Sequence, residues 1–481
     1  MSLFVTKSLA LLTEDAEQGS LKRALGAGQL IALGIGAIIG AGIFTLAGVA
    51  AGTYAGPAVT LSFVAAALGC VFAGLCYSEF STMIPVAGSA YTYAYATMGE
   101  LIAWIIGWDL VLEYAVGAAT VSIGWSSYLV SILHDFHITL PAALIASPWQ
   151  PVTLPGGEVV YGIINLPAVF ITIAISVLLI IGIQESATAN AFIVVCKVAV
   201  VVTFIVLGWS FINRANYTPY IPPSTGGGHF GYSGILTAAG VIFFAYIGFD
   251  AVSTAAQEAR NPQRDMPIGI IGSLVVCTIL YILYAHVLTG IVNYKELNVA
   301  APLAVAVDHI PYPVVGEMMK IGSLMGLTSV MLVMLLGQSR VFFSMSKDGL
   351  LPPLYSKVHP KFRTPYLSNA ILMVFVSIFA GFAPIGVVGE MTSIGTLLAF
   401  VIVCAGIIVM RRTRPDLPRP FRTPWVPVVP ILGILVNFAL MAGLGLSNWL
   451  RLVIWLAIGL VIYFSYSRSR SHARNGSPRV L

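Results

Sequence analysis

Long apolar runs, separated by short polar connections, dominate the chain. A helix that crosses a bilayer needs about 20 mostly apolar residues, because each residue advances it by about 1.5 Å. Runs of this kind cover residues 27–51, 57–81, 98–131, 164–183, 190–212, 233–256, 267–291, 317–345, 366–383, 387–410, 426–446 and 449–466. The pattern predicts an all-α integral membrane protein of about 12 transmembrane helices.

The composition also requires a lipid environment. Of the 481 residues, 58% are hydrophobic and 9% are charged, whereas an average soluble protein has roughly 25% charged residues. The five cysteines lie inside apolar runs without a CxxC pair, so we expect neither a disulfide nor a metal cluster. The histidines show no metal-binding or hydrolase spacing. The sequence therefore predicts no metal and no cofactor.

Basic residues predict the orientation, because loops rich in Lys and Arg tend to remain cytoplasmic. Of the 24 Lys and Arg residues, nineteen fall on the side that would hold both termini, four fall on the other side, and Lys197 lies within a span. We expect a multi-pass protein of the cell membrane, with a cytoplasmic segment 1–26 and a basic cytoplasmic tail 467–481. We interpret the tail as a topology anchor or a lipid-headgroup contact, and we expect no nucleic-acid partner.

Glycines crowd the middle of the first run, which reads LGIGAIIGAGIFTLAG over residues 33–48. Each glycine weakens a helix by about 1 kcal/mol, so the helix is predicted to break there. Close helix packing is the alternative, because Gly36 and Gly40 form a GxxxG pattern. A dinucleotide-binding loop is excluded, since the spacing misses GxGxxG and no βαβ pattern surrounds it.

The sixth run has a fainter interruption, with Gly240 and Gly248 ahead of Asp250. In hydrocarbon, a non-helical stretch survives only around a cavity or ligand. The free N–H groups that begin a half-helix attract an anion, and the freed carbonyl groups can bind a cation. Two such breaks together suit a zwitterion.

The two interrupted runs occupy equivalent positions if residues 27–212 and 233–410 are two five-helix repeats, followed by two appended helices within 426–466. Paired interruptions of this kind indicate a transporter site at an inverted-repeat interface. The halves share no obvious residue identity, so the repeat is inferred from position alone.

Four strings in this order resemble the amino acid–polyamine–organocation superfamily, specifically the cationic amino acid transporter-like permeases. They are GAIIGAGIF (36–44), YSEFSTMIPVAGSAYTY (77–93), FFAYIGFDAVSTAAQEARNPQRDMP (243–267) and GQSRVFFSMSKDGLLP (337–352). The resemblance spans the first ten predicted helices. It implies a leucine-transporter-like fold of two inverted five-helix repeats, with helices 1 and 6 discontinuous.

The resemblance also implies that backbone groups at the two breaks bind the substrate. The substrate carboxylate is expected at the N–H groups of Ala41 and Gly42, and its ammonium at the carbonyls of Ile38, Phe244 and Ile247. The ring of Phe244 is expected to gate the site. The full predicted substrate-binding set is Ile38, Gly40, Ala41, Gly42, Phe244, Ala245, Ile247, Glu113 and Leu327.

Lys197 is predicted to be the proton-coupling residue. A Lys at a helix centre costs about 2.5–3.5 kcal/mol on insertion scales, so such residues tend to be functional, and burial favours loss of the proton. In relatives, a Lys here stands where sodium-coupled members bind their ion. We expect Lys197 to bridge helix 5 to carbonyls of helix 1 and to a hydroxyl of helix 8, Thr328 or Ser329. A fixed structural lysine is the alternative.

The side-chain specificity depends on helices 3 and 8. Asp109 and Glu113 lie four residues apart and therefore on one helical face. Glu113 either borders the substrate, which would favour a cationic side chain, or forms a polar contact with another helix. Met325 and Leu327 make helix 8 apolar, which favours neutral amino acids.

Charged residues at cytoplasmic helix ends are candidates for an inner gate. They are Glu79, Asp250, Glu258, Arg260, Arg340 and Asp348. We expect Glu258, Arg260 and Arg340 to act with Phe244 in gating. Ordinary solvation at the membrane interface is the alternative.

These features predict a secondary active transporter that takes up L-amino acids with protons by alternating access. An exchanger of the same fold is the alternative, and a channel is a further one. No Walker motif is present, and no nucleophile–base pair converges, so neither an ATP-driven pump nor an enzyme is expected. The expected partners are an amino acid, a proton and the lipid bilayer, with a monomer or weak oligomer as the assembly.

Overall fold

The computed structural model describes residues 5–7, 25–84, 89–153, 158–182, 187–254 and 259–475. Its main helices are α2 (Ala27–Ile38), α4 (Val59–Met83), α5 (Ser89–Thr97), α6 (Glu100–Val111), α7 (Gly117–Asp135), α8 (Leu166–Ile181), α9 (Ala187–Gly208), α10 (Gly231–Ile242), α11 (Phe249–Thr254), α12 (Pro262–Ile291), α13 (Pro302–Val307), α14 (Pro313–Lys347), α15 (Tyr366–Phe382), α16 (Ile385–Thr413), α17 (Val428–Gly443) and α18 (Leu446–Ile462). The predicted all-α character is confirmed.

Shorter elements connect these helices. They are α3 (Ala47–Ala50), α19 (Arg468–Arg470), α20 (His472–Asn475), and the antiparallel strands β1 (Pro151–Thr153) and β2 (Val159–Tyr161). Proline stands at or next to the first position of α8, α12, α13 and α14, where its missing N–H is not needed and its φ angle suits a helix.

Within the described residues, seven helical stretches are long and apolar enough to cross a membrane. They are Gly42–Met83, Glu100–Asp135, Ala191–Phe211, Pro262–Ile291, Pro313–Lys347, Ile385–Thr413 and Leu446–Arg470. Shorter apolar helices cover Ala27–Ile38, Leu166–Ile181, Gly231–Tyr246, Tyr366–Phe382 and Val428–Gly443. On α4, Leu61, Val64 and Leu68 are exposed at three- and four-residue spacing, so one helical face is apolar and outward, as contact with lipid requires.

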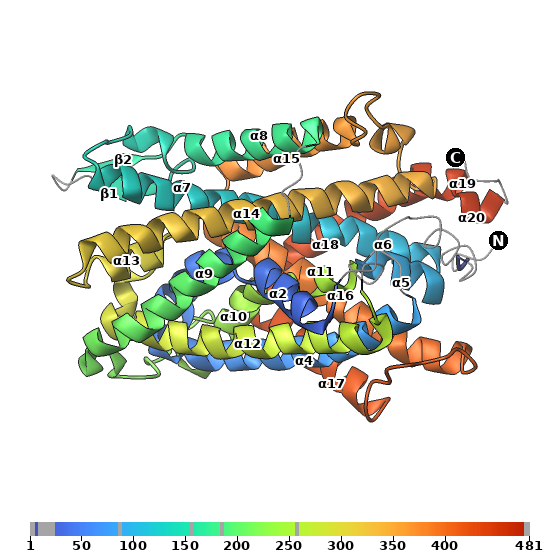
Figure 1. Cartoon of the computed structure of the whole chain (residues 1–481), viewed down its shortest axis with the longest axis horizontal. Helices are drawn as coiled ribbons and strands as arrows, with labels where there is room; N and C mark the ends of the chain where they lie inside the picture. The colour runs from blue at the N-terminus through green and yellow to red at the C-terminus, as the bar shows by residue number, and fades with distance from the viewer. Residues whose placement is uncertain are drawn as a thin grey trace.

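The long helices surround shorter ones. Figure 1 shows α4, α12 and α14 along the long axis of the molecule, with α9 crossing them obliquely and α2 near the middle of the view. α12 packs against both α2 and α4, α8 packs on α15, and α14 packs on α7 and α9. This arrangement buries the segments in which the two helices are interrupted.

Both ends of the described chain lie at the same end of the molecule (Figure 1). Lys7 forms an ion pair with Asp348 at 2.9 Å, and the Asp348 carbonyl accepts a hydrogen bond from His472 N. The Glu100 N–H donates to the Val5 carbonyl. The N- and C-terminal segments therefore contact the same two acidic residues.

The side chain of Glu100 is fully buried at this point. It accepts hydrogen bonds from Tyr463 at 2.8 Å, from Arg474 Nε at 2.6 Å and from Ser471. The C-terminal tail thus supplies part of the shell that compensates a buried charge.

At the opposite end, Lys320 on α14 is 1% exposed and joins three acidic side chains. Its Nζ lies 2.6 Å from Asp135, 2.9 Å from Asp308 and 3.6 Å from Glu317. These contacts tie the end of α7 to the connection between α13 and α14.

Candidate functional site

The first apolar run does not continue as one α-helix. α2 ends at Ile38, and Ile39 adopts an extended conformation with φ −71° and ψ 107°. Helix resumes after Gly40, first as the π-helical turn η1 (Gly42–Leu46). Ile38, Gly40, Ala41 and Gly42 are all buried, so the backbone groups freed here need partners inside the protein.

The sixth run is interrupted as well. α10 passes into the 3₁₀ turn η8 (Phe243–Tyr246), after which Ile247 is extended with ψ 132°. Gly248 has a φ angle of +120°, a conformation that only glycine adopts readily, and α11 then begins at Phe249. Phe244, Ala245 and Ile247 are buried in this segment.

The two interrupted segments touch each other through their backbones. A Cβ atom added to Gly42 would lie 2.8 Å from Ala245 N and closer still to Ala245 Cα. A Cβ atom added to Gly248 would lie 2.6 Å from the carbonyl oxygen of Ala37. Glycine is therefore required at both positions by close backbone approach.

Lys197 reaches the first interruption from α9. Its side chain is fully buried, and Nζ donates to the carbonyl of Gly36, to that of Ile39 at 3.2 Å and to Ser329 Oγ on α14 at 3.2 Å. Ser329 is thus the α14 partner, whereas Thr328 accepts a hydrogen bond from Trp125 Nε1 at 3.0 Å. One ammonium group joins three helices at the end of α2.

Tyr281 on α12 links the two interruptions, and the sequence analysis missed it. Its hydroxyl lies 2.9 Å from the Ile38 carbonyl and 2.9 Å from the Ala245 carbonyl. The Ile38 carbonyl was predicted to accept a hydrogen bond from the substrate ammonium. In this structure it faces the Tyr281 hydroxyl instead. A tyrosine inside an apolar run was the available signal, because a buried phenol usually has a hydrogen-bond partner.

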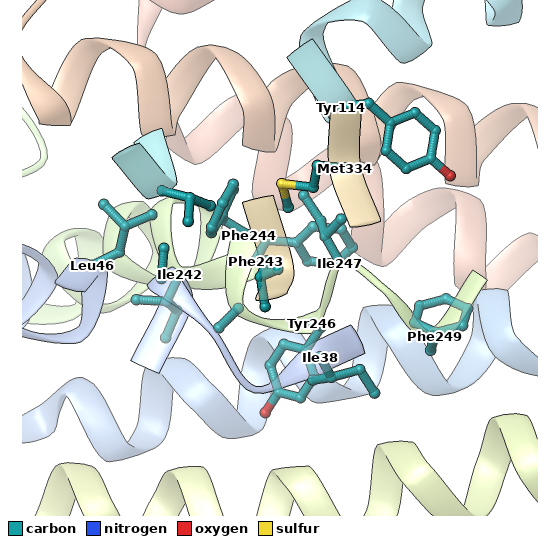
Figure 2. Packing of buried hydrophobic residues seen from close by; sticks show 14 of the residues in the cluster. Ile38, Leu46, Tyr114, Ile242, Phe243, Phe244, Tyr246, Ile247, Phe249 and Met334 are labelled. Atoms are coloured by element: carbon teal, nitrogen blue, oxygen red, sulfur yellow. The ribbon is translucent and has the colours of Figure 1, made fainter. Parts of the chain in front are cut away.

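A mostly apolar group lies beside the interruptions. Figure 2 shows Phe244, Ile247 and Met334 close together. A Cβ atom on Gly117 would lie 3.3 Å from Met334 Sδ, 3.4 Å from the Thr392 methyl and 3.5 Å from the Phe244 ring. Met334 is therefore one α14 side chain at this group, and Val330 on the same helix lies against Gly40. Leu327, which the sequence selected, is buried about two turns from Met334, and its role stays a prediction.

Comparison with known proteins identifies the chain. Residues 25–466 match the amino acid permease family. The chain belongs to this family. The resemblance to the amino acid–polyamine–organocation superfamily is thereby confirmed.

Named relatives of this permease are transporters. It is 46% identical to the branched-chain amino acid permease BcaP of Bacillus subtilis (strain 168), over 98% of each chain. It is 42% identical to the methylthioribose transporter of the same organism, over 98% of this chain and 99% of that protein. It is also 30% identical to the vacuolar cationic amino acid transporter 4 of Arabidopsis thaliana, over 87% of each chain.

Glu113 of the permease lies inside the third apolar run. It is 1% exposed, in the π-helical turn η4 (Leu112–Val116), and its neighbour Tyr114 donates a hydrogen bond to Asp250 at 2.9 Å. Both alternatives for Glu113, a border of the substrate site and a polar contact between helices, stay predictions.

The acids of the predicted gate cluster have partners in different parts of the described chain, and their role in gating stays a prediction. Glu79 binds Arg411 at 2.8 Å and lies 3.3 Å from Arg419, Asp348 binds Lys7, and Asp250 accepts from Tyr114 at 2.9 Å. Each acid is therefore joined to a different part of the permease. Hydropathy does not predict several of these partners, because they lie in the connection after α16 or near the chain termini.

The remaining predicted gating residues lie apart from Phe244. Arg260 and Arg340 are exposed, and the Arg260 N–H donates to the Leu25 carbonyl at 2.8 Å. Phe244 is buried beside the interruptions. Glu258 lies outside the described residues.

Proposed function

We propose that this permease takes up neutral L-amino acids together with protons, by alternating access across the cell membrane. The contact that carries the proposal is the Lys197 ammonium on the Gly36 and Ile39 carbonyls and on Ser329. A charge held there stabilises the end of α2 against α9 and α14. Loss of the proton weakens all three hydrogen bonds at once and frees α2 to move.

The substrate would bind where the two interruptions meet. The N–H groups at the start of η1 supply a partial positive charge for a carboxylate, and the carbonyls of Ile38 and Ala245 supply acceptors for an ammonium. In this structure the two carbonyls share the single hydroxyl proton of Tyr281. An incoming ammonium would replace it as donor, so binding and rearrangement of the two interruptions are one event.

The side chain would be apolar and branched. Phe244 and Met334 face Gly117, and these groups offer dispersion contacts rather than a charge partner. The 46% identity to a branched-chain amino acid permease points the same way. The relation to a methylthioribose transporter makes that sugar a second candidate, although it has neither the carboxylate nor the ammonium that the interruptions suit.

We further infer 12 spans in two inverted five-helix repeats and two appended helices, with both termini in the cytoplasm. The interruptions would then lie at equivalent places in the two repeats, near the middle of the bilayer. Nineteen basic residues on the terminal side support this orientation.

Uptake into liposomes tests the proposal. With an acidic exterior, labelled leucine should accumulate, saturate and prefer the L-form, and a protonophore should abolish the accumulation. Labelled arginine and methylthioribose should enter poorly. An exchanger would require substrate inside the liposomes, and a channel would neither saturate nor discriminate between stereoisomers.

Lys197→Met tests the coupling role. It should retain leucine exchange between the two sides but lose accumulation driven by the pH gradient. Lys295→Met is the matched control, because Lys295 is exposed in a connection, and it should behave as the parent protein. Full pH-driven accumulation by Lys197→Met would refute the role of Lys197.

A further inference from the structure

The C-terminal segment, residues 467–475, folds back onto the rest of the protein. It follows α18 and contains α19 and α20, which lie at the end of the molecule near the end of α14 (Figure 1). The Ser467 hydroxyl donates to the Leu350 carbonyl at 2.6 Å, and the His472 N–H donates to the Asp348 carbonyl at 3.1 Å. The segment is therefore bound to the turn that follows α14.

Arg474 in α20 reaches the side chain of Glu100 at the start of α6. The distance from Arg474 Nε to Glu100 Oε1 is 2.6 Å, and the two side chains are 4% and 0% exposed. A second Arg474 nitrogen donates to the Tyr463 hydroxyl at 2.9 Å, and this hydroxyl donates to Glu100 at 2.8 Å. One closed ring of hydrogen bonds thus joins the C-terminal segment, the end of α18 and the start of α6.

The other carboxylate oxygen of Glu100 faces two more hydroxyl groups. It accepts hydrogen bonds from Tyr95 on α5 at 3.2 Å and from Ser471. Among the described residues, Arg474 is the only basic side chain that forms an ion pair with this acid. Removing one partner of a buried ion pair leaves an uncompensated charge and is strongly destabilising, whereas replacing both partners is often nearly neutral. The packing of this end therefore depends on Arg474 staying in place.

A short chain of contacts connects Glu100 to the second interruption. Glu100 directly follows the turn that joins α5 to α6, α5 packs against α11, and α11 packs against α2. Tyr93 on α5 and Phe249 at the start of α11 both contact the ring of Tyr77 on α4, with centroid distances of 6.3 and 5.6 Å. A displacement of α2 and α11 therefore disturbs α5, to which the C-terminal segment is tied through Tyr95 and Glu100.

We propose that residues 467–475 are a latch that keeps this end of the molecule closed, and that the ion pair between Arg474 and Glu100 holds the latch. The conformation seen here buries the two charges against each other, whereas an opening at this end lets water reach each of them. The pair therefore stabilises the closed conformation far more than the open one and shifts the balance between them. The latch releases when α2 and α11 move to open this end. This inference rests on the proposed alternating access.

Hydrogen–deuterium exchange of the purified protein without substrate tests the latch. In Arg474→Gln, the backbone amides of α2 and α11 should exchange at least about tenfold faster, because loss of one partner of a buried ion pair shifts an equilibrium by more than about one power of ten. Arg468→Gln is the matched control, because Arg468 is an exposed arginine of the same segment, and it should exchange as the parent does. Arg474→Lys keeps the charge and should give a smaller increase, which covers the case in which Arg474→Gln folds poorly.

The double variant Glu100→Gln, Arg474→Gln separates the latch from a merely structural contact. It has neither charge, and its two amide side chains can still form hydrogen bonds with Tyr463 and Ser471, so exchange in α2 and α11 should return most of the way to the parental rate. Absence of this rescue would overturn the role of the ion pair. Faster exchange in Arg474→Gln that is confined to residues 467–475 and the start of α6 would show a local anchor and overturn the latch. Equal acceleration in α8 would show a general loss of stability and would overturn it as well.

Liposome uptake separates failure of this inference from failure of the proposed function. If the parent takes up leucine but α2 and α11 of Arg474→Gln exchange at the parental rate, the latch is refuted and the proposed function stands. If exchange in α2 and α11 rises as expected but the parent moves no amino acid, the proposed function fails, and the latch stands as a device that closes this end.

Discussion

The closest backbone approach in the site leads to a sharp prediction for Gly42→Ala. The new methyl group would lie 2.8 Å from Ala245 N and nearer to Ala245 Cα, whereas an ordinary contact between non-bonded carbon atoms is about 3.5–4.0 Å. No side-chain rotation relieves a clash with backbone, so the two interruptions must separate by roughly 1.5–2 Å to restore an ordinary contact with Ala245 Cα. Overpacking against backbone that cannot rotate away falls in the upper part of the usual range, about 2–3 kcal/mol, partly offset by roughly 1 kcal/mol that alanine gains in a helix.

The net penalty of about 1–2 kcal/mol corresponds to roughly 5–30-fold weaker leucine binding, because the N–H of residue 42 and the facing carbonyls no longer converge. Calorimetric titration of the purified protein measures it. Gly28→Ala is the control on α2, since no atom lies within 4 Å of its added Cβ, and it should bind as the parent does. Parental affinity in Gly42→Ala would refute the idea that these two backbones jointly form the site.

Three further substitutions have defined outcomes. Tyr281→Phe removes the one hydroxyl proton that the two carbonyls share, at about 1–3 kcal/mol, so thermal stability should fall without substrate and recover with saturating leucine. An equal loss in both conditions would contradict the exchange of donors. In Gly248→Ala the new residue must adopt a positive φ angle, at a cost of about 1–3 kcal/mol, and its methyl group would clash with the Ala37 carbonyl. Uptake should fall sharply although expression is normal, and parental uptake would contradict the need for glycine here. Lys320→Met leaves three acids that are 30–59% exposed without their positive partner. Stability at neutral pH should fall, by less than the about 3–5 kcal/mol lost when a fully buried pair is broken, and acidification should restore the melting temperature as the carboxylates protonate. A loss that is independent of pH would argue against repulsion between the acids.

Local backbone chemistry was the most predictable part of the site. Glycine density identified the end of α2 near Ile38, because repeated loss of helix propensity acts within a few residues. Lys197 was identifiable from its cost in an apolar run, whereas its carbonyl partners were expected from the family resemblance. The second interruption gave a weaker signal, because it depends on the single residue Gly248. The composition of the run does not reveal that this glycine has a positive φ angle.

Contacts between distant segments were less predictable. Leu327 and Met334 lie on the same helix and are both apolar, so only the orientation of α14 decides which one approaches Phe244. Tyr281 had no sequence pattern that tied it to two carbonyls on other helices. The pairing of Glu79 with Arg411 depends on how the chain after α16 folds back, which neither hydropathy nor charge counting determines.

The contacts of Glu100 have a consequence for biosynthesis. This acid enters the bilayer with one of the first helices, yet Ser471 and Arg474 are separated from it by 371 and 374 positions. While the ribosome is still making the later helices, Glu100 lacks part of its final coordination and must stay hydrated. The end of the permease where both described termini lie is therefore completed only after Ser471 and Arg474 have been made.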